Sequence, residues 1–276
     1  MAARAHYERA LISLSHSLAN VKRDNCDAVF LSSRLMFIAF SVMPSDYDNE
    51  YGNNTLPRGH SIRFSPLPDS SQSLPSDSFL ASLDRVLEWL GLVRGIFSTF
   101  VLFEEWIKRG FLYTTLSKDP QSESKFLNGS VNPEDDSYLH RYSEFLTLSP
   151  ETDPATADFC EKAIVQLRKY MVIMDGKYWP ETAFLWALLV SEDFMNAIKR
   201  RRPEALVILA FFGGFLGKSE LMWWAEGWPV YVARAVKGNL DFRWKRWIQW
   251  PLETLGLEQI LRGNSPELSS PKNPRV

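Results

Sequence analysis

Apolar residues recur at intervals of three and four along most of the chain, which is the spacing of one face of an α-helix. Leu11, Leu14 and Leu18 show this spacing near the N-terminus, and a longer run extends from Asp77 to about Arg109. No stretch alternates apolar and polar residues between turns, as a half-buried β-strand does. The pattern therefore predicts an all-α protein.

Two long stretches interrupt the helical pattern. Residues 44–76 combine five prolines with serines, glycines and asparagines, and residues 117–133 are mostly polar. Such compositions are typical of surface loops, and the Ser- and Pro-rich tail is expected to be flexible. We therefore predict one helical domain over residues 1–262, with two long surface loops at about 44–76 and 117–133, followed by a flexible tail, 263–276.

Prolines and glycines mark the expected ends of several helices. Asp153-Pro154 combines an N-cap residue with a proline in the first turn, and Pro203 begins another helix in the same way. The glycines of residues 213–217 are expected to end or kink that helix. Ser219 is expected to cap a tryptophan-rich helix, which Gly227-Trp228-Pro229 then breaks.

Composition and charge restrict the function classes. The 276 residues include 31 Lys and Arg against 33 Asp and Glu, which gives a net charge of −2. Proteins that bind a nucleic-acid backbone usually carry a basic excess, so we expect no direct nucleic-acid binding by this chain. The N-terminus has the pattern of an amphipathic helix rather than a signal peptide, and the longest apolar run, 205–216, is too short for a transmembrane segment. An intracellular, reduced protein is expected.

Residues that carry common chemistry are sparse. The chain has no phosphate-binding glycine loop, dinucleotide fingerprint, zinc-protease motif or serine-hydrolase motif. Cys26 and Cys160 have no zinc-ligand spacing and are expected to be buried, inert thiols. No metal site and no cofactor are predicted. The basic run 199–202 is interpreted as the end of one helix before Pro203, rather than as a nuclear-import or phosphate-binding site.

The aromatic residues are the strongest functional signal. They make up 13% of the chain, and six of the ten tryptophans lie between Trp223 and Trp250. Any single aromatic residue at helical spacing is more often core than ligand contact. Large flat side chains on consecutive helices joined by a glycine-rich corner would nevertheless leave space for a rigid apolar ligand. The predicted ligand-binding residues are Phe211, Phe212, Phe215, Trp223, Trp224, Trp228 and Tyr231.

Five strings occur in an order that is familiar from one family. They are "AHYERALISLSHSLANVKRDNCDAVFLSSRLMFIAF", "LEWLGLVRGIFSTF", "IKRRRPEALVILAFF", "WWAEGW" and "WKRWIQWPLETLG". Together they resemble the C-terminal regulatory domain of fungal zinc-cluster transcription factors, in the branch named for sterol uptake control. The resemblance runs from about Ala5 to Gly256 and implies an all-α domain that holds a sterol-like ligand. By this resemblance, the residues that line the ligand pocket would be Phe211 and Phe212 of "ALVILAFF" and the tryptophans of "WWAEGW".

Three features depart from the family pattern. The six-cysteine zinc cluster that reads DNA is missing. The helices that usually precede "AHYERAL" are missing too, so we expect either a fragment or a naturally short protein. After "LAFF", the string "GGFLGKS" replaces a continued apolar helix and a basic residue, which alters one wall of the expected pocket.

Three functions are consistent with the sequence. The first is sensing of a hydrophobic, sterol- or terpenoid-like small molecule by a regulatory domain in the nucleus, as a homodimer or with a partner regulator. The alternative is a cytoplasmic cyclase or isomerase of fungal secondary metabolism, in which an aromatic pocket folds a polyene or stabilises a cation. The third is an interaction module without a ligand. The acids of an enzyme would be Glu220 and Glu226, with Tyr178 and Tyr231 as donors.

Overall fold

The computed structural model describes residues 2–42, 77–109, 132–175, 184–219, 221 and 223–258. Every regular element within these ranges is a helix, which confirms the all-α prediction. The predicted loop 44–76 and the predicted tail 263–276 lie outside the described residues. The second predicted loop, 117–133, also lies outside them, except for its last two residues, where a helix begins. The single-domain assignment stays a prediction.

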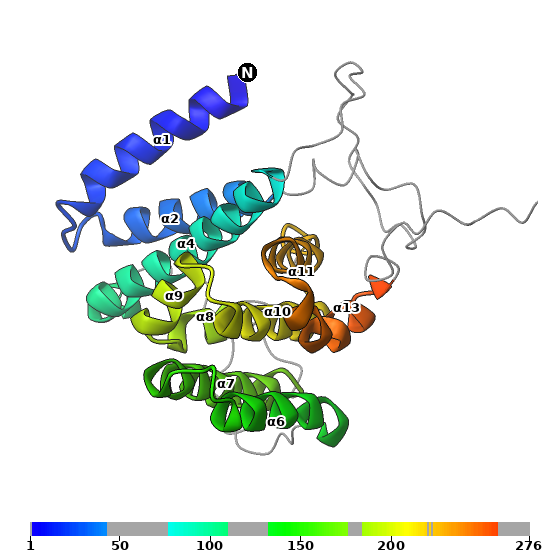
Figure 1. The fold of residues 1–276 in the computed structure, drawn as a ribbon. Helices are drawn as coiled ribbons and strands as arrows, with labels where there is room; N and C mark the ends of the chain where they lie inside the picture. Colours follow the sequence, from blue (N-terminus) through cyan, green and yellow to red (C-terminus); the bar gives the residue numbers. More distant parts are fainter. Residues whose placement is uncertain are drawn as a thin grey trace, which may run out of the picture.

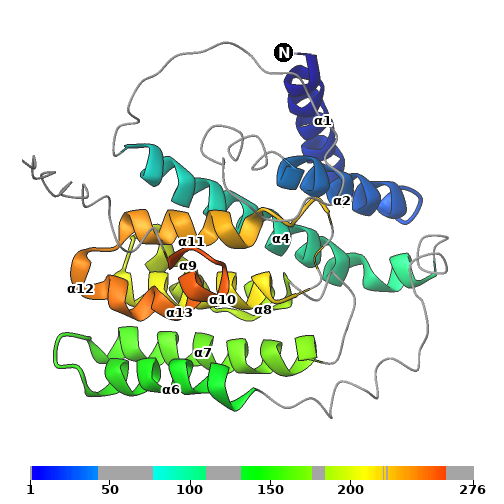
Figure 2. The ribbon, with the colours of Figure 1, turned by 90° about the vertical axis from the view of Figure 1, so that its right-hand side faces the viewer.

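The helices form three layers, one in the middle and one on each side of it. In chain order they are α1 (Ala2–Leu18), α2 (Cys26–Val42), α4 (Asp77–Lys108), α6 (Pro133–Leu148), α7 (Pro154–Asp175), α8 (Leu185–Leu189), α9 (Glu192–Lys199), α10 (Pro203–Gly217), α11 (Trp228–Asn239), α12 (Phe242–Lys245), the 3-10 turn η4 (Arg246–Ile248) and α13 (Gln249–Thr254). Helices α2 and α4 lie on one side, α10, α11 and α13 in the middle, and α6 and α7 on the other side (Figures 1 and 2). Helix α1 extends from the first layer and packs against α2.

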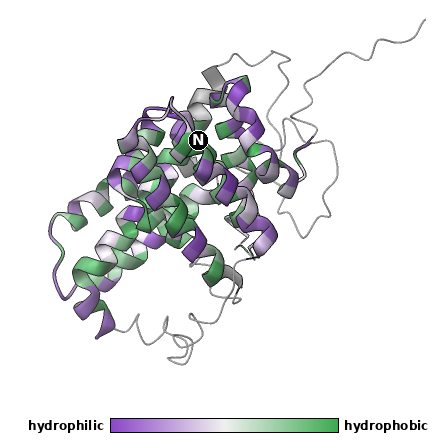
Figure 3. Ribbon diagram, turned by 60° about the horizontal axis from the view of Figure 1, so that its bottom comes forward, coloured by the Kyte–Doolittle hydropathy of each residue, from purple (hydrophilic) through white to green (hydrophobic). Residues whose placement is uncertain are grey.

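Helix α10 is the centre of the hydrophobic core. Every residue from Glu204 to Leu216 is buried, and the helix contacts α7, α9, α11 and α13. A helix that is apolar on all sides needs neighbours on all sides, and the layered arrangement supplies them. The outer helices instead interleave hydrophobic and hydrophilic residues along the ribbon (Figure 3).

The predicted helix starts at Pro154 and Pro203 are confirmed. Asp153 Oδ1 accepts hydrogen bonds from the backbone N–H groups of Ala155 (3.1 Å) and Thr156 (3.0 Å), as an N-cap side chain does. Helix α6 begins on the same plan, because the Asn132 side chain accepts a 2.9 Å hydrogen bond from the N–H of Glu134.

One local prediction about helix ends is wrong, and another is confirmed only at Gly217, where α10 ends. Residues 223–227 form turns, and Trp228 with Pro229 begins α11 instead of ending a helix. Proline is tolerated in the first turn because no backbone N–H is needed there, so a Gly-Trp-Pro string is compatible with both a start and a stop. Helix α10 runs through Gly213 and Gly214, where an end or a kink is predicted, and ends at Gly217.

No single helix in the described ranges is both long enough and apolar enough to cross a membrane. The two parts of α4, Leu83–Thr99 and Val101–Lys108, meet at 49° and pass that test together, by length and composition alone. Helix α10 is apolar but shorter, and it is buried inside the molecule.

Candidate functional site

The structure divides six of the seven predicted ligand-binding residues among three groups of packed rings. The α4–α11 cluster consists of Phe37, Phe40, Trp89, Phe184, Trp224, Trp228 and Tyr231. The α6–α13 cluster consists of Tyr138, Tyr142, Phe145, Phe211, Phe215, Trp244, Trp247 and Trp250. Phe212 belongs to a third group with Tyr170, Trp186 and Phe194. Trp223 is outside all three and is 69% exposed.

The α4–α11 cluster is closed on itself. Trp89 and Trp228 are fully buried and stack with ring centres 4.3 Å apart and planes at 10°. The indole N–H of Trp89 donates to the Ser41 hydroxyl (3.2 Å), and that of Trp228 donates to the Ser41 carbonyl (3.0 Å). Buried tryptophans need a partner for the N–H as well as for the ring. Because both needs are met within the protein, these two tryptophans act as core residues.

The glycines of α10 allow close approach of two other helices. A Cβ atom at Gly213 would lie 3.1 Å from Val232 Cγ1, and one at Gly214 would lie 2.9 Å from Trp250 Cζ3. Helices α11 and α13 therefore occupy the space beside these glycines, where the sequence predicted room for a ligand.

A pocket of about 300 Å³ opens at the α6–α13 cluster. Small-molecule pockets usually measure about 300–1,000 Å³, so this one suits a compact ligand. Phe211 and Trp250 are buried and stack at 5.4 Å, which makes the inner wall aromatic. Of the seven predicted residues, Phe211 lines this pocket. The full lining is Tyr138 and Arg141 from α6, Phe211 from α10, and Arg246, Trp247, Gln249, Trp250 and Glu253 from η4 and α13.

Two arginines stand over aromatic rings of this pocket. The guanidinium carbon of Arg141 lies 4.8 Å from the centre of the Tyr138 ring, and that of Arg246 lies 5.2 Å from the Trp247 ring. Both are exposed, and neither forms an ion pair with a carboxylate among the described residues. The acid of the lining, Glu253, accepts a 2.6 Å hydrogen bond from the Gln249 side chain. The pocket thus combines an apolar inner wall with a rim that carries positive charge.

Of the four residues predicted for an enzyme, the two that the structure describes, Glu226 and Tyr231, do not line this pocket. Glu226 is exposed on the turn before α11. Tyr231 is half-buried, with its ring 5.4 Å from the Trp228 ring. Glu220 and Tyr178 lie outside the described residues.

Metal and thiol chemistry have little basis in the described part of the chain. No group of three or more His, Cys, Asp or Glu side chains there is placed to hold a metal ion. Cys26 and Cys160 are free and buried, as predicted. Burial raises the pKa of both thiols, which disfavours the reactive thiolate.

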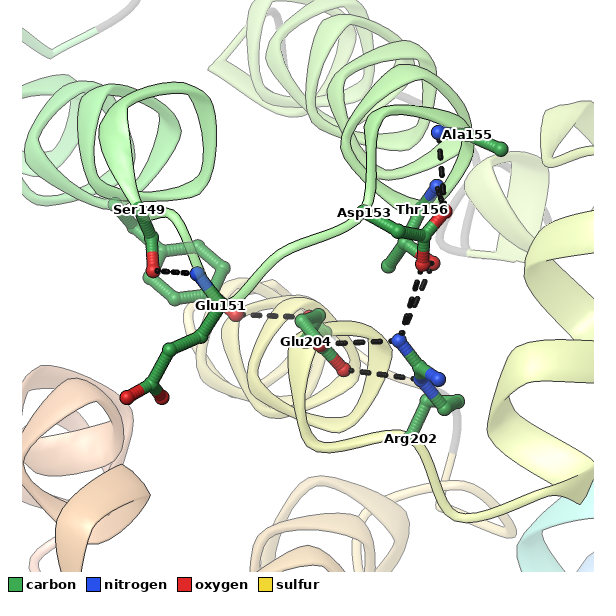
Figure 4. Close-up of polar contacts among 8 residues, drawn as sticks. Ser149, Glu151, Asp153, Ala155, Thr156, Arg202 and Glu204 are labelled. Atoms are coloured by element: carbon green, nitrogen blue, oxygen red, sulfur yellow. Dashed lines mark hydrogen bonds and ion pairs between the residues drawn. The ribbon is translucent and has the colours of Figure 1, made fainter.

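The basic run 199–202 is engaged in structural contacts. Arg201 pairs with Asp84 at 3.1 Å, and the Arg202 guanidinium lies 3.3 Å from both Asp153 and Glu204 (Figure 4). Hydrogen bonds from Thr156, together with the charge of Arg202, lower the pKa of the Asp153 carboxyl. These contacts tie the N-termini of α7 and α10 together, which confirms the interpretation of the run as a helix boundary.

The sequence analysis did not identify most of the pocket. One signal was present, because Arg246, Trp247, Gln249 and Trp250 all fall within the string "WKRWIQW", in which aromatic and cationic residues alternate at short intervals. The contribution of α6 had no such signal. Arg141 and Arg246 are 105 residues apart in the sequence, and helical periodicity does not specify which faces meet.

A protein of known class shares sequence similarity with the whole length of this chain. The chain is similar to a protein of Gibberella zeae described as a "Zn(2)-C6 fungal-type transcription factor", with 21% identity over 286 aligned residues. The alignment covers 100% of this chain and 53% of the relative, so the chain spans about half of that protein's length. No protein-family model and no solved structure matches the chain. The similarity supports a distant relation to fungal transcription regulators and does not distinguish the sterol-uptake branch.

Proposed function

We propose that this chain is a ligand-sensing regulatory domain of a fungal transcription regulator and acts in the nucleus. The observation that carries the proposal is the similarity to a fungal transcription factor along the whole chain. The net charge of −2 supports a division of labour in which another segment or another protein binds DNA.

The proposed ligand is a hydrophobic small molecule, with sterols and terpenoids as the classes to test first. The α6–α13 pocket is the proposed binding site, since its inner wall is aromatic and its rim is open to solvent. Its volume of about 300 Å³ favours a compact ring system, or the ring end of a longer molecule, over complete enclosure of a large lipid. Of the predicted ligand-binding residues, Phe211 keeps that role in the proposal.

Ligand binding is tested by thermal-shift and native mass-spectrometric screening of sterols and terpenoids against the purified chain. The variant Gln249→Trp should block the pocket without disturbing the core, because Gln249 is an exposed lining residue. Lys169→Trp is the matched control, since it adds a tryptophan to an exposed position of α7 away from the pocket. A ligand that stabilises the wild type and Lys169→Trp but not Gln249→Trp supports the proposal. Equal stabilisation of all three would place the ligand elsewhere.

The same screen separates the other hypotheses. A sensor releases its ligand unchanged. Recovery of a rearranged product that disappears in Glu226→Gln would establish the cyclase or isomerase alternative. Absence of any stabilising compound would favour an interaction module. A fusion of the chain to a DNA-binding domain of known specificity then tests regulation, because reporter expression should depend on the added ligand.

A further inference from the structure

We propose that the ligand of the α6–α13 pocket is an organic acid, with a flat apolar ring body and a carboxylate at its edge that Arg141 and Arg246 bind together. This inference rests on the proposed function, because it specifies the chemistry of the molecule that enters the same pocket. It is based on the hydrogen-bond and ion-pair partners of these two arginines, compared with those of the other described arginines.

Most arginines in the described ranges already have an acceptor. Arg94 donates to the carbonyls of Ala187 (3.0 Å) and Val190 (2.8 Å). Arg168 pairs with Asp136 at 2.7 Å, and Arg202 is held by two carboxylates. The guanidinium groups of Arg141 and Arg246 instead contact only the faces of aromatic rings, among the contacts that the described residues make. Their N–H donors are therefore available to a ligand.

The two guanidinium groups approach the pocket from different elements. Arg141 comes from α6, one turn after Tyr138, and Arg246 comes from η4, next to Trp247. Each lies against its own ring, at 4.8 Å and 5.2 Å. A guanidinium that already lies over a ring has fewer positions to lose when it binds a carboxylate, and its forked N–H groups match the two carboxylate oxygens.

The charge of the lining favours an anion. The lining residues include two arginines and one glutamate, a sum of +1, in a chain whose net charge is −2. The Gln249 amide already donates to the single acid, Glu253, at 2.6 Å. A bound carboxylate would thus meet two cations that have no counterion among the described residues.

The apolar half of the ligand is specified by the rings. Trp250 lies between Phe211, with ring centres 5.4 Å apart, and Tyr138, at 6.0 Å. Because Phe211 and Trp250 are almost fully buried, a ligand would contact mainly the half-buried rings of Tyr138 and Trp247, which suit a flat, rigid ring system whose edge points toward the rim. The aromatic rings and the two arginines of the pocket together indicate an aromatic or polycyclic carboxylic acid.

Two probes of the same shape test the charge preference. We would titrate the intact chain with naphthalene-2-carboxylate and with the neutral naphthalene-2-carboxamide, by isothermal calorimetry at low salt. The carboxylate should bind more tightly by on the order of tenfold, the lower end for charge-assisted hydrogen bonds, because both arginines are exposed. The difference should shrink as salt is raised, since exposed charges are screened.

Variants assign the preference to the two arginines. Arg141→Gln combined with Arg246→Gln should remove the carboxylate preference, so that the two probes bind about equally. Arg243→Gln removes one charge from neighbouring α12, where Arg243 faces Glu151 at 3.7 Å, and should preserve the preference. Glu253→Gln should strengthen carboxylate binding, because it removes the one negative charge of the lining.

The outcomes separate this inference from the proposed function. Equal binding of both probes that Gln249→Trp abolishes would overturn the acid preference while supporting a hydrophobic-ligand pocket. A carboxylate preference that survives in the double arginine variant would overturn the assignment to Arg141 and Arg246. If neither probe binds the wild type, both the inference and the proposed pocket fail.

Discussion

The α4–α11 and α6–α13 clusters are built from the same kinds of residue and differ in how they are closed. In the first, Trp89 and Trp228 are fully buried, stack on each other and share Ser41 as hydrogen-bond acceptor. In the second, Trp250 is buried, Trp247 is half-buried, and a pocket of about 300 Å³ remains beside them. The covering elements explain the difference. Helices of 32 and 12 residues close the first cluster, whereas in the second the rings of α6 and α10 pack against helical segments of only four, three and six residues.

This comparison shows that aromatic content alone does not make a cavity. Long helices present regular ridges that fill the grooves of their neighbours to crystal-like density. Short helical segments change direction every few residues, so their side chains do not continue such ridges. We therefore interpret the α4–α11 cluster as structural core and the α6–α13 cluster as the candidate binding site.

The largest expected effect is a loss of folding stability when a ring of the α4–α11 cluster is removed. Trp228→Ala should lower the free energy of unfolding by about 3–5 kcal/mol, as large-to-small changes at fully buried tryptophans do. Trp223→Ala is the control and should change it by less than about 0.5 kcal/mol, because Trp223 is 69% exposed. Urea unfolding followed by circular dichroism measures both. Similar losses in the two variants would contradict the assignment of Trp228 to a closed core.

Removal of the Ser41 hydroxyl, the hydrogen-bond acceptor of Trp89, should lower the free energy of unfolding by a smaller amount. Ser41→Ala leaves the buried N–H of Trp89 without its hydroxyl partner, and an unsatisfied buried donor costs about 1–3 kcal/mol. The Trp228 bond goes to the Ser41 backbone and persists. Ser15→Ala removes an exposed hydroxyl of α1 and should leave the urea midpoint nearly unchanged. A Ser41→Ala protein as stable as the wild type would indicate that Trp89 finds another acceptor.

Substitution of two glycines tests how tightly the helices around each cluster are packed. Gly214→Ala would press a methyl group against Trp250 (2.9 Å) and the Pro251 backbone (3.2 Å), so overpacking should outweigh the gain in helix propensity and destabilise by about 1–2 kcal/mol. Gly91→Ala, in α4, meets nothing within 4 Å and should stabilise by about 0.5–1 kcal/mol. Thermal unfolding should therefore shift in opposite directions. Stabilisation by Gly214→Ala would mean that Trp250 moves easily, which would also enlarge or close the pocket.

The smallest expected effect is on the pH dependence of stability at the N-terminus of α7, where Asp153 lies. The folded-state pKa of Asp153 lies below its ordinary value of 3.8, chiefly because of the Thr156 hydrogen bond. The ionised carboxylate therefore stabilises the fold above that value, and the stabilisation is lost as the pH falls through the folded-state pKa. Asp153→Asn should be less stable than the wild type at pH 6 and equally stable in strong acid. Urea midpoints between pH 2 and 6 measure this, and Thr156→Val should reduce the difference because it removes the hydroxyl donor.

Most helix boundaries could be predicted because their signals are local. Asp153 caps the turn that follows it, and α7 and α10 begin at the predicted Pro154 and Pro203. The start of α11 could not be predicted in the same way, because Trp228-Pro229 is compatible with the end of one helix and the start of another. Neighbouring helices resolve that ambiguity, since α10 and α4 both pack against α11.

Local patterns in the sequence specified the helical class, the helix starts at Pro154 and Pro203 and the concentration of tryptophans near the C-terminus. Each of these depends on residues close together in the chain, whose spacing and side-chain chemistry act locally. Only the tertiary structure decided which rings pack into core and which border a pocket, and that two arginines 105 residues apart stand at one rim. The physical reason is that a cavity is set by how well facing side chains fill the space between helices, and that fit depends on partners that no local pattern names.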